Sequence, residues 1–240
     1  MKRLAKPEGK YNLILEEAPM PQPAPGEVRI QAVRSLISRG SEMGARYTRE
    51  HAVSHEIMGY SMAGIIDALG DGVSHFALGD RVVATAPHAQ YTVRPAETTS
   101  PDAQSRVVAL PDDVSWDQAP YYPLTSGSVT WVDVADAGLS EAVVILGQGL
   151  VGSLMLQVMK ANGKGHVVVV DALDNRCDLA RELGADEVIN YREVPDWGKA
   201  VLGLTDGIGA DLVVEVGGAD TIGQSMRSTR ADGTMSLIGN

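Results

Sequence analysis

Hydrophobic and polar residues follow different patterns in the two halves of the chain. Before about residue 115, short runs of β-type residues alternate with turn signals, for example GEVRIQAV (26–33), MAGIIDAL (62–69) and DRVVATA (80–86). Alternation of this kind, interrupted by Gly, Pro and Asp, is typical of strands joined by tight connections. It predicts a small, mostly β, barrel-like domain over residues 1–115.

The second half alternates strand-like and helix-like segments. Apolar residues dominate EAVVIL (141–146), HVVVVD (166–171) and DLVVEVGG (211–218), whereas residues 150–163 and 174–184 have the apolar spacing and terminal glycine of helices. Buried strands that alternate with helices predict a parallel sheet covered on both faces. We therefore expect an α/β fold, with a doubly wound domain over residues 116–240.

Composition and charge restrict the kind of partner. The 240 residues carry a net charge of −11 and a single cysteine, Cys177. The acidic balance argues against nucleic acid, and one thiol excludes an internal disulfide or a zinc site of several thiolates. The N-terminus lacks the apolar stretch of a signal peptide, and no apolar run approaches a membrane span. We expect a cytoplasmic protein that acts on a small molecule, with neither nucleic acid nor membrane as partner.

The stretch ILGQGLVG (145–152) carries a G-x-G-x-x-G motif between a predicted strand and a predicted helix. Gly147 permits a tight turn, a side chain at Gly149 would block a pyrophosphate, and Gly152 lets helix and strand approach closely. The phosphates would lie at the positive end of the helix that opens with Leu150 and Val151. The alternative is a glycine-rich turn that holds no ligand.

Asp171 ends the second strand, nineteen residues after Gly152. A dinucleotide site needs an acid about 20 residues beyond its glycines, to accept a hydrogen bond from the ribose 2′-hydroxyl. A carboxylate there repels a 2′-phosphate, which favours NAD over NADP. Arg176 either lies along the adenine or is a solvated helix residue.

Several segments together resemble the medium-chain dehydrogenase/reductase superfamily, which includes zinc alcohol dehydrogenases and quinone reductases. The most specific is SHEIMGYSMAGIIDALGDGVSHFALGDRVVA (54–84), and PAPGEVRIQAV (23–33) and ILGQGLVG add to it. The resemblance implies a GroES-like β barrel followed by a Rossmann domain, with the nicotinamide in the cleft between them. It also implies a set of residues near the nicotinamide: Thr125, Val216, Gly217, Ile238 and Gly239.

The resemblance also allows the zinc-ligand positions of that superfamily to be checked. They fall on Ser38, His55 and Tyr122. Neutral hydroxyls are poor zinc ligands, and the cysteine-rich lobe that holds a structural zinc in some relatives is absent. We expect no zinc.

Without zinc, side chains must stabilise the alkoxide that develops during hydride transfer. His55 has the intrinsic pKa suited to a proton shuttle, and Glu56 would orient it or carry the proton onward. Ser38 and Tyr122 would hydrogen-bond the substrate oxygen. The alternatives are a core histidine at His55, a turn hydroxyl at Ser38 and a packing aromatic at Tyr122.

The segment SRGSE (38–42) resembles the S-x-G-[ST]-E motif of a zinc-free branch that includes bacteriochlorophyllide dehydrogenases. Its small residues suit a tight turn. Arg39 and Glu42 either contact substrate or pair with each other on the surface. His88 is a further candidate, with capping of a loop as the alternative.

The chain ends at SLIGN (236–240), which we interpret as the fifth strand of a truncated Rossmann sheet. Members of the superfamily continue beyond this strand, so the sequence is a fragment, lacks a remainder, or is a shortened member. A homodimer is one candidate assembly, and the sequence leaves the oligomeric state open. Three functions are open: an NAD-dependent, zinc-free dehydrogenase of secondary alcohols or ketones (polyol, sugar or larger hydroxylated compound), a quinone or enoyl reductase, and a non-catalytic dinucleotide-binding protein.

Overall fold

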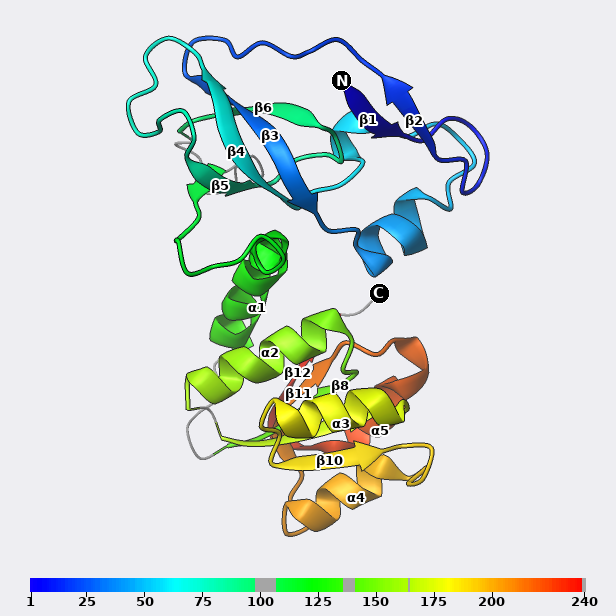
Figure 1. The fold of residues 1–240 in the computed structure, drawn as a ribbon. Helices are drawn as coiled ribbons and strands as arrows, with labels where there is room; N and C mark the ends of the chain where they lie inside the picture. Colours follow the sequence, from blue (N-terminus) through cyan, green and yellow to red (C-terminus); the bar gives the residue numbers. More distant parts are fainter. Residues whose placement is uncertain (98–106, 136–140, 164, 239–240) are drawn as a thin grey trace. The chain divides into compact units, whose positions relative to one another are not determined.

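The structure, a computed structural model, describes residues 1–97, 107–135, 141–163 and 165–238. The chain forms two compact units, Met1–Pro123 and Leu124–Asn240. The first is rich in antiparallel strands and the second is an α/β unit (Figure 1). The predicted change of architecture along the chain is confirmed.

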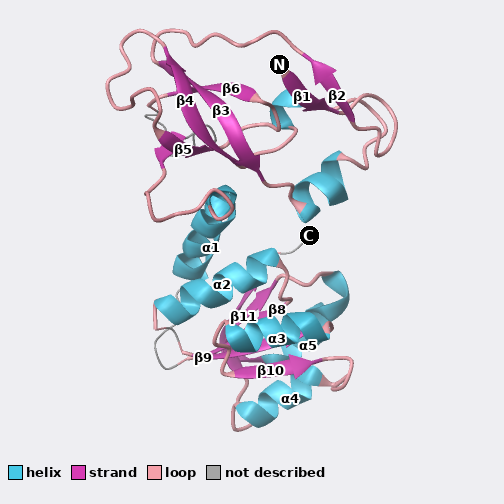
Figure 2. Ribbon diagram, viewed as in Figure 1, coloured by secondary structure: helices cyan, strands magenta, loops and turns pink. Residues whose placement is uncertain are grey.

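The first unit is built on a five-stranded antiparallel sheet with the order β6-β3-β4-β5-β7. Figure 2 labels four of these strands, β3, β4, β5 and β6. Successive side chains of a strand point to opposite faces of the sheet. Along β3, Val28 and Ile30 therefore share one face, and both are buried. The pairing of β3 with β4 shifts register at two points, and such bulges bend a sheet. The strands of this sheet are β3 (Glu27–Ser35), β4 (Met62–Leu69), β5 (Arg81–Ala84), β6 (Tyr91–Pro95) and β7 (Val107–Ala109).

A hairpin and three short helical segments complete the described part of this unit. The hairpin pairs β1 (Lys2–Ala5) with β2 (Ile14–Glu17). Two single-turn helices, η2 (His55–Ile57) and η3 (Ala119–Tyr121), follow loops. The third, η1 (Arg39–Arg46), is a π-helix where the sequence predicted a tight turn. Ser38 caps it, because its hydroxyl accepts the Ser41 N–H at 3.4 Å.

The second unit has a parallel five-stranded sheet with the order β10-β9-β8-β11-β12. The chain builds outward from β8 on both sides, so the strand order reverses between β8 and β11, where ligands bind in open α/β sheets. The predicted strands are confirmed as β8 (Ala142–Leu146), β9 (His166–Asp171), β10 (Glu187–Asn190), β11 (Ala210–Glu215) and β12 (Thr229–Leu237).

Helices cover both faces of this sheet. On one face, Val143, Ile145, Val167 and Val169 pack with residues of three helices: α1 (Tyr122–Ala135), α2 (Leu150–Ala161) and α3 (Asp174–Glu182). The alternate strand residues face α4 (Trp197–Leu204), which itself contacts α5 (Ile222–Ser228). In the residues that the structure describes, no helix is both long and apolar enough to cross a membrane.

Candidate functional site

The glycine turn after β8 has three positions with different steric constraints. Gly147 has φ +94°, a conformation that favours glycine, and a Cβ there would lie 3.1 Å from Gly217. A Cβ on Gly152 would lie 1.9 Å from the Gly147 carbonyl oxygen, so this helix residue must be glycine for α2 to approach the turn. A Cβ on Gly149 would meet no described atom within 4 Å. Gly149 therefore borders open space.

This open space lies at the N-terminus of α2. Gly149 caps the helix without a side chain, and the chain continues into the helix through exposed Leu150 and half-buried Val151. The buried Gln148 side chain has an amide nitrogen, Nε2, with no hydrogen-bond partner among the described residues. Free backbone N–H groups and the helix dipole make such a terminus suitable for an anion. The turn therefore fits a pyrophosphate.

Asp171 ends β9 next to this turn, and the residue is 4 % exposed. One oxygen accepts the N–H of Gln148 at 2.7 Å, and the other accepts the N–H groups of Ala172 and Leu173 at 2.7 and 2.9 Å. The carboxylate therefore ties the end of β9 to the glycine turn. Since a carboxylate offers about four acceptor positions, about one remains for another donor.

Arg176 is the third residue of α3, in the first turn of that helix. Its Nη1 is 3.5 Å from Asp171 Oδ2, and its side chain is 29 % exposed. The side chain is therefore partly buried, and its guanidinium lies beside the Asp171 carboxylate.

Three of the residues expected near the nicotinamide lie at the same carboxyl edge of the sheet. Val216 donates its N–H to the Leu146 carbonyl at 2.9 Å, and Ile238 donates its N–H to the Glu215 carbonyl at 3.0 Å. Val216, Ile238 and Val151 also pack against one core cluster. Gly217 is the neighbour of Gly147 noted above. Thr125 lies on α1, and Gly239 falls outside the described residues.

Glu215 is a buried carboxylate at this edge that the sequence reasoning did not single out. Its Oε1 accepts the N–H groups of Gly217 and Gly218 at 2.8 and 3.0 Å. Its Oε2 accepts the hydroxyls of Thr221 and Ser225 at 3.0 and 2.7 Å. The signal was present, because Glu215 is the one charged residue in the apolar end of β11.

In the first unit, Ser38 lies at the start of η1 and is half-buried. Its backbone N–H donates to Glu42 Oε2 at 2.8 Å. Glu42 is fully buried and does not pair with Arg39 on the surface; its other oxygen accepts from the Tyr47 hydroxyl and from His88 Nε2, both at 2.8 Å. The His88 side chain therefore contacts Glu42 through Nε2 and the Ser35 hydroxyl through Nδ1, at 2.9 Å.

His55 and Glu56 lie on η2, with His55 Nε2 2.8 Å from Glu56 Oε1. Ser54 caps this turn, since its hydroxyl accepts the Glu56 N–H at 3.3 Å. The His55 side chain is 37 % exposed, which excludes a buried core histidine. Both residues line a pocket of about 210 Å³ together with Tyr91 and Arg94. Burial lowers the pKa of Arg94, against the opposing charge of Glu56.

Tyr122 is the first residue of α1 and is 36 % exposed. Within the described residues, no hydrogen bond or ion pair joins it to Ser38 or His55, and no group of three or more His, Cys, Asp or Glu side chains is placed to hold a metal. Zinc prefers thiolate, imidazole and carboxylate ligands. With one imidazole and two neutral hydroxyls, the three ligand positions do not fit zinc.

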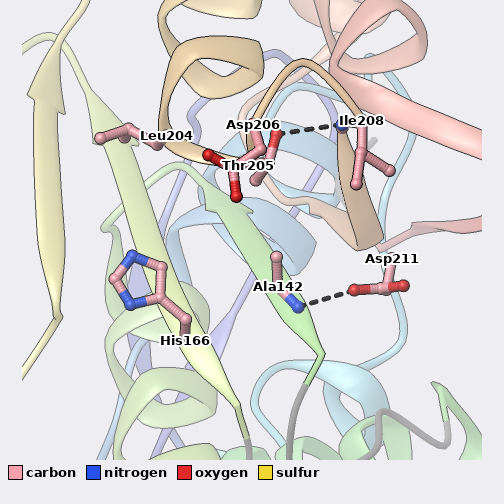
Figure 3. Close-up of a pocket in the computed structure, with 8 residues that line it drawn as sticks. Ala142, His166, Leu204, Thr205, Asp206, Ile208 and Asp211 are labelled. Atoms are coloured by element: carbon pink, nitrogen blue, oxygen red, sulfur yellow. Dashed lines mark hydrogen bonds between the residues drawn. The ribbon is translucent and has the colours of Figure 1, made fainter.

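A second pocket, of about 390 Å³, lies at the opposite edge of the parallel sheet (Figure 3). It is lined by Ala142 and His166, the first residues of their strands, and by Asp211, whose Oδ2 accepts the Ala142 N–H at 2.7 Å. Ligands of open α/β sheets bind at the carboxyl ends of strands. This pocket is therefore separate from the glycine turn.

Two family models match the chain. The model of the alcohol dehydrogenase GroES-like domain matches residues 24–112, and that of the zinc-binding dehydrogenase matches residues 151–240.

Individual relatives agree with these matches. The D-guloside 3-dehydrogenase of Escherichia coli (strain K12) is 30 % identical over 182 residues, which cover 75 % of this chain and 50 % of that protein. The L-threonine 3-dehydrogenase of Pyrococcus abyssi is 29 % identical over 275 residues, which cover 100 % of this chain and 76 % of that protein. The chain thus spans half to three quarters of the length of these relatives.

Among solved structures, a quinone oxidoreductase of Pseudomonas syringae pv. Tomato DC3000 has a similar fold. The TM-score is 0.81 at 26 % sequence identity, and the match covers 100 % of this chain and 74 % of that one.

Proposed function

Since the chain belongs to the medium-chain dehydrogenase/reductase superfamily, we propose that it is an NAD-dependent oxidoreductase acting on a secondary alcohol or ketone. The substrate class is a polyol, a sugar or a larger hydroxylated compound. The observation that carries the proposal is the open space at Gly149, at the N-terminus of α2, in the turn that also donates a hydrogen bond to the Asp171 carboxylate.

Different residues of the chain would bind different parts of the coenzyme. The pyrophosphate would accept from the N–H groups at the start of α2, where Gly149 borders open space. Asp171 would accept from the ribose with its remaining acceptor position. When bound, NAD accepts a hydride from an alcohol, or NADH returns one to a ketone.

Selectivity for NAD rests on the charge of Asp171. Its carboxylate is buried, and the three backbone N–H groups that it accepts fix its position. A 2′-phosphate placed beside it would bring two like charges into a site with little solvent to screen them. Arg176, already paired with Asp171 at 3.5 Å, compensates only part of that repulsion.

Oxidation of an alcohol releases a proton as well as a hydride, so a base is required. His55 meets this need: Nε2 bonds Glu56 at 2.8 Å, and Nδ1 remains to take the hydroxyl proton. Ser38 and Tyr122 would hydrogen-bond the substrate oxygen. We propose that the reaction proceeds without zinc, because the donor set of Ser38, His55 and Tyr122 does not suit it.

A quinone reductase is the second candidate, supported by the similarity to the Pseudomonas syringae quinone oxidoreductase. The two candidates differ in substrate. The dehydrogenase reduces NAD at the expense of an alcohol, whereas the reductase consumes reduced coenzyme and a quinone.

The test is a spectrophotometric assay that follows the absorbance of reduced coenzyme. The compounds are L-threonine, a D-guloside, 2,3-butanediol and 1,4-benzoquinone, each tested with the oxidised and the reduced forms of NAD and NADP. We expect oxidation of a hydroxylated compound with NAD and its loss in His55→Gln. His75→Gln is the matched control, because His75 forms a comparable exposed pair with Glu97 at 2.6 Å. Turnover of only the quinone would replace the proposal with the second candidate; full activity in His55→Gln would remove the proposed base.

A further inference from the structure

A buried polar cluster in the first unit connects segments that carry the proposed substrate-facing residues. The cluster consists of Glu42, Tyr47 and His88, with Ser35 and Ser38 at its edges. Its centre is the Glu42 carboxylate, which is 0 % exposed and accepts three hydrogen bonds. A buried charge is costly unless it is paired and hydrogen-bonded, and here each acceptor contact has a defined partner.

From this geometry we infer that Glu42 is a positioning residue for Ser38 and, through His88, for the turn that carries His55. The inference rests on the proposed function for its catalytic part. The direct step is short: the Ser38 N–H donates to Glu42 Oε2 at 2.8 Å. The carboxylate thereby fixes the backbone from which the Ser38 hydroxyl projects.

The second step passes through His88. Since an ionised carboxylate only accepts, His88 Nε2 donates to Glu42, and Nδ1 contacts the Ser35 hydroxyl at 2.9 Å. The His88 backbone N–H then donates to the Met58 carbonyl at 2.6 Å, and the Met58 N–H donates to the His55 carbonyl at 3.0 Å. A continuous hydrogen-bonded path therefore runs from Glu42 to the His55 turn.

The packing around His88 is close, so this path has little freedom. Gly59 has φ +112°, and a Cβ there would lie 2.8 Å from the backbone nitrogen of His88 and 2.9 Å from Cδ2 of its imidazole ring. Gly59 therefore makes room for the ring. Burial opposes ionisation of Glu42, but the bonds from His88, Ser38 and Tyr47 outweigh it and hold the pKa of Glu42 below its ordinary value.

The test compares Glu42→Gln with two controls. A glutamine of the same shape is uncharged and has one oxygen for three donors, so in one amide orientation the Ser38 N–H loses its acceptor and in the other it keeps only a weaker, uncharged one. Tyr47→Phe removes one donor and leaves the Ser38 bond intact. Glu50→Gln alters an exposed carboxylate that pairs with Lys10 at 3.5 Å.

Amide hydrogen exchange measured by NMR on the full chain gives the first readout. We expect the Ser38 amide to exchange about tenfold faster or more in Glu42→Gln, and at the wild-type rate in both controls. An unchanged Ser38 amide in a folded Glu42→Gln protein would overturn the inference, whatever its activity.

Turnover with the substrate found in the screen, and NADH affinity by fluorescence, give the second readout. We expect kcat of Glu42→Gln to fall about 10- to 100-fold, with NADH affinity within twofold of wild type. A faster-exchanging Ser38 amide with wild-type kcat would overturn the catalytic part. A wild-type protein that binds no NADH would instead overturn the proposed function, and the exchange result would still decide the role of Glu42 at Ser38.

Discussion

Replacing Gly149 and Gly152 separately by alanine distinguishes a coenzyme-binding turn from a merely structural one. Both glycines belong to the same motif, but their surroundings differ. A Cβ on Gly149 meets open space and its backbone, with φ −69°, is one that alanine adopts. A Cβ on Gly152 lies 1.9 Å from the Gly147 carbonyl oxygen, which is part of the backbone and cannot rotate away.

From these distances we expect different effects of the two substitutions on the free energy of unfolding. Alanine at Gly149 loses about 1 kcal/mol as a helix N-cap and regains about 0.4–1 kcal/mol from a less flexible unfolded chain, so the net change is small. Alanine at Gly152 forces α2 and the turn apart, at a cost of about 1–3 kcal/mol. For a chain of this size that corresponds to a fall in Tm of roughly 2–12 °C.

Gly149→Ala should lose coenzyme affinity although its stability is nearly unchanged. In Gly149→Ala the new methyl group occupies the space assigned to the pyrophosphate and breaks hydrogen bonds to an anion, which lowers NADH affinity about 10- to 100-fold. The assays are NADH fluorescence titration and thermal unfolding of both variants. If Gly149→Ala binds NADH as tightly as wild type, the space at Gly149 does not hold the phosphates and the reasoning is refuted.

Three further predictions address other parts of the account. Asp171→Asn should lower the ratio of the NADPH dissociation constant to the NADH dissociation constant about tenfold or more, because the repulsion between the carboxylate and the 2′-phosphate is removed. An unchanged ratio in a titration with both coenzymes would contradict the proposed basis of selectivity. Because the folded pKa of Glu42 is lowered from 4.5, its stabilising effect should be present above about pH 4.5 and be lost as the pH falls through the folded value. In urea unfolding, the stability advantage of wild type over Glu42→Gln should therefore shrink in acid, and a constant advantage would argue against an ionised Glu42. Elemental analysis of purified protein should find no stoichiometric zinc; one zinc per chain that is lost in His55→Ala would overturn the zinc-free mechanism.

Local sequence patterns predicted the parts of the fold that depend on local chemistry. The apolar runs around β8, β9 and β11 predicted buried parallel strands, and the glycine spacing predicted the turn into α2. These features follow from side-chain periodicity and from backbone conformations that few residues adopt, and both can be read within about ten residues.

Contacts between distant residues were not predictable in the same way. Glu42 and His88 are 46 positions apart, and nothing near either residue indicates that the fold buries them together. The segment after Ser38 was expected to be a tight turn, but the carboxylate of Glu42 and the hydroxyl of Ser38 satisfy backbone N–H groups and so support the π-helix η1. For Asp171 the sequence predicted a bond to ribose but not the three backbone N–H groups that its carboxylate accepts.

Calorimetric titration of the wild-type chain with NADH and with NADPH measures directly whether the glycine turn holds a coenzyme and which one it prefers. We expect one NADH to bind per chain, about tenfold or more tightly than NADPH, because the turn at Gly147–Gly152 accepts the pyrophosphate while the Asp171 carboxylate repels a 2′-phosphate. Binding of neither coenzyme, or tighter binding of NADPH, would contradict this expectation.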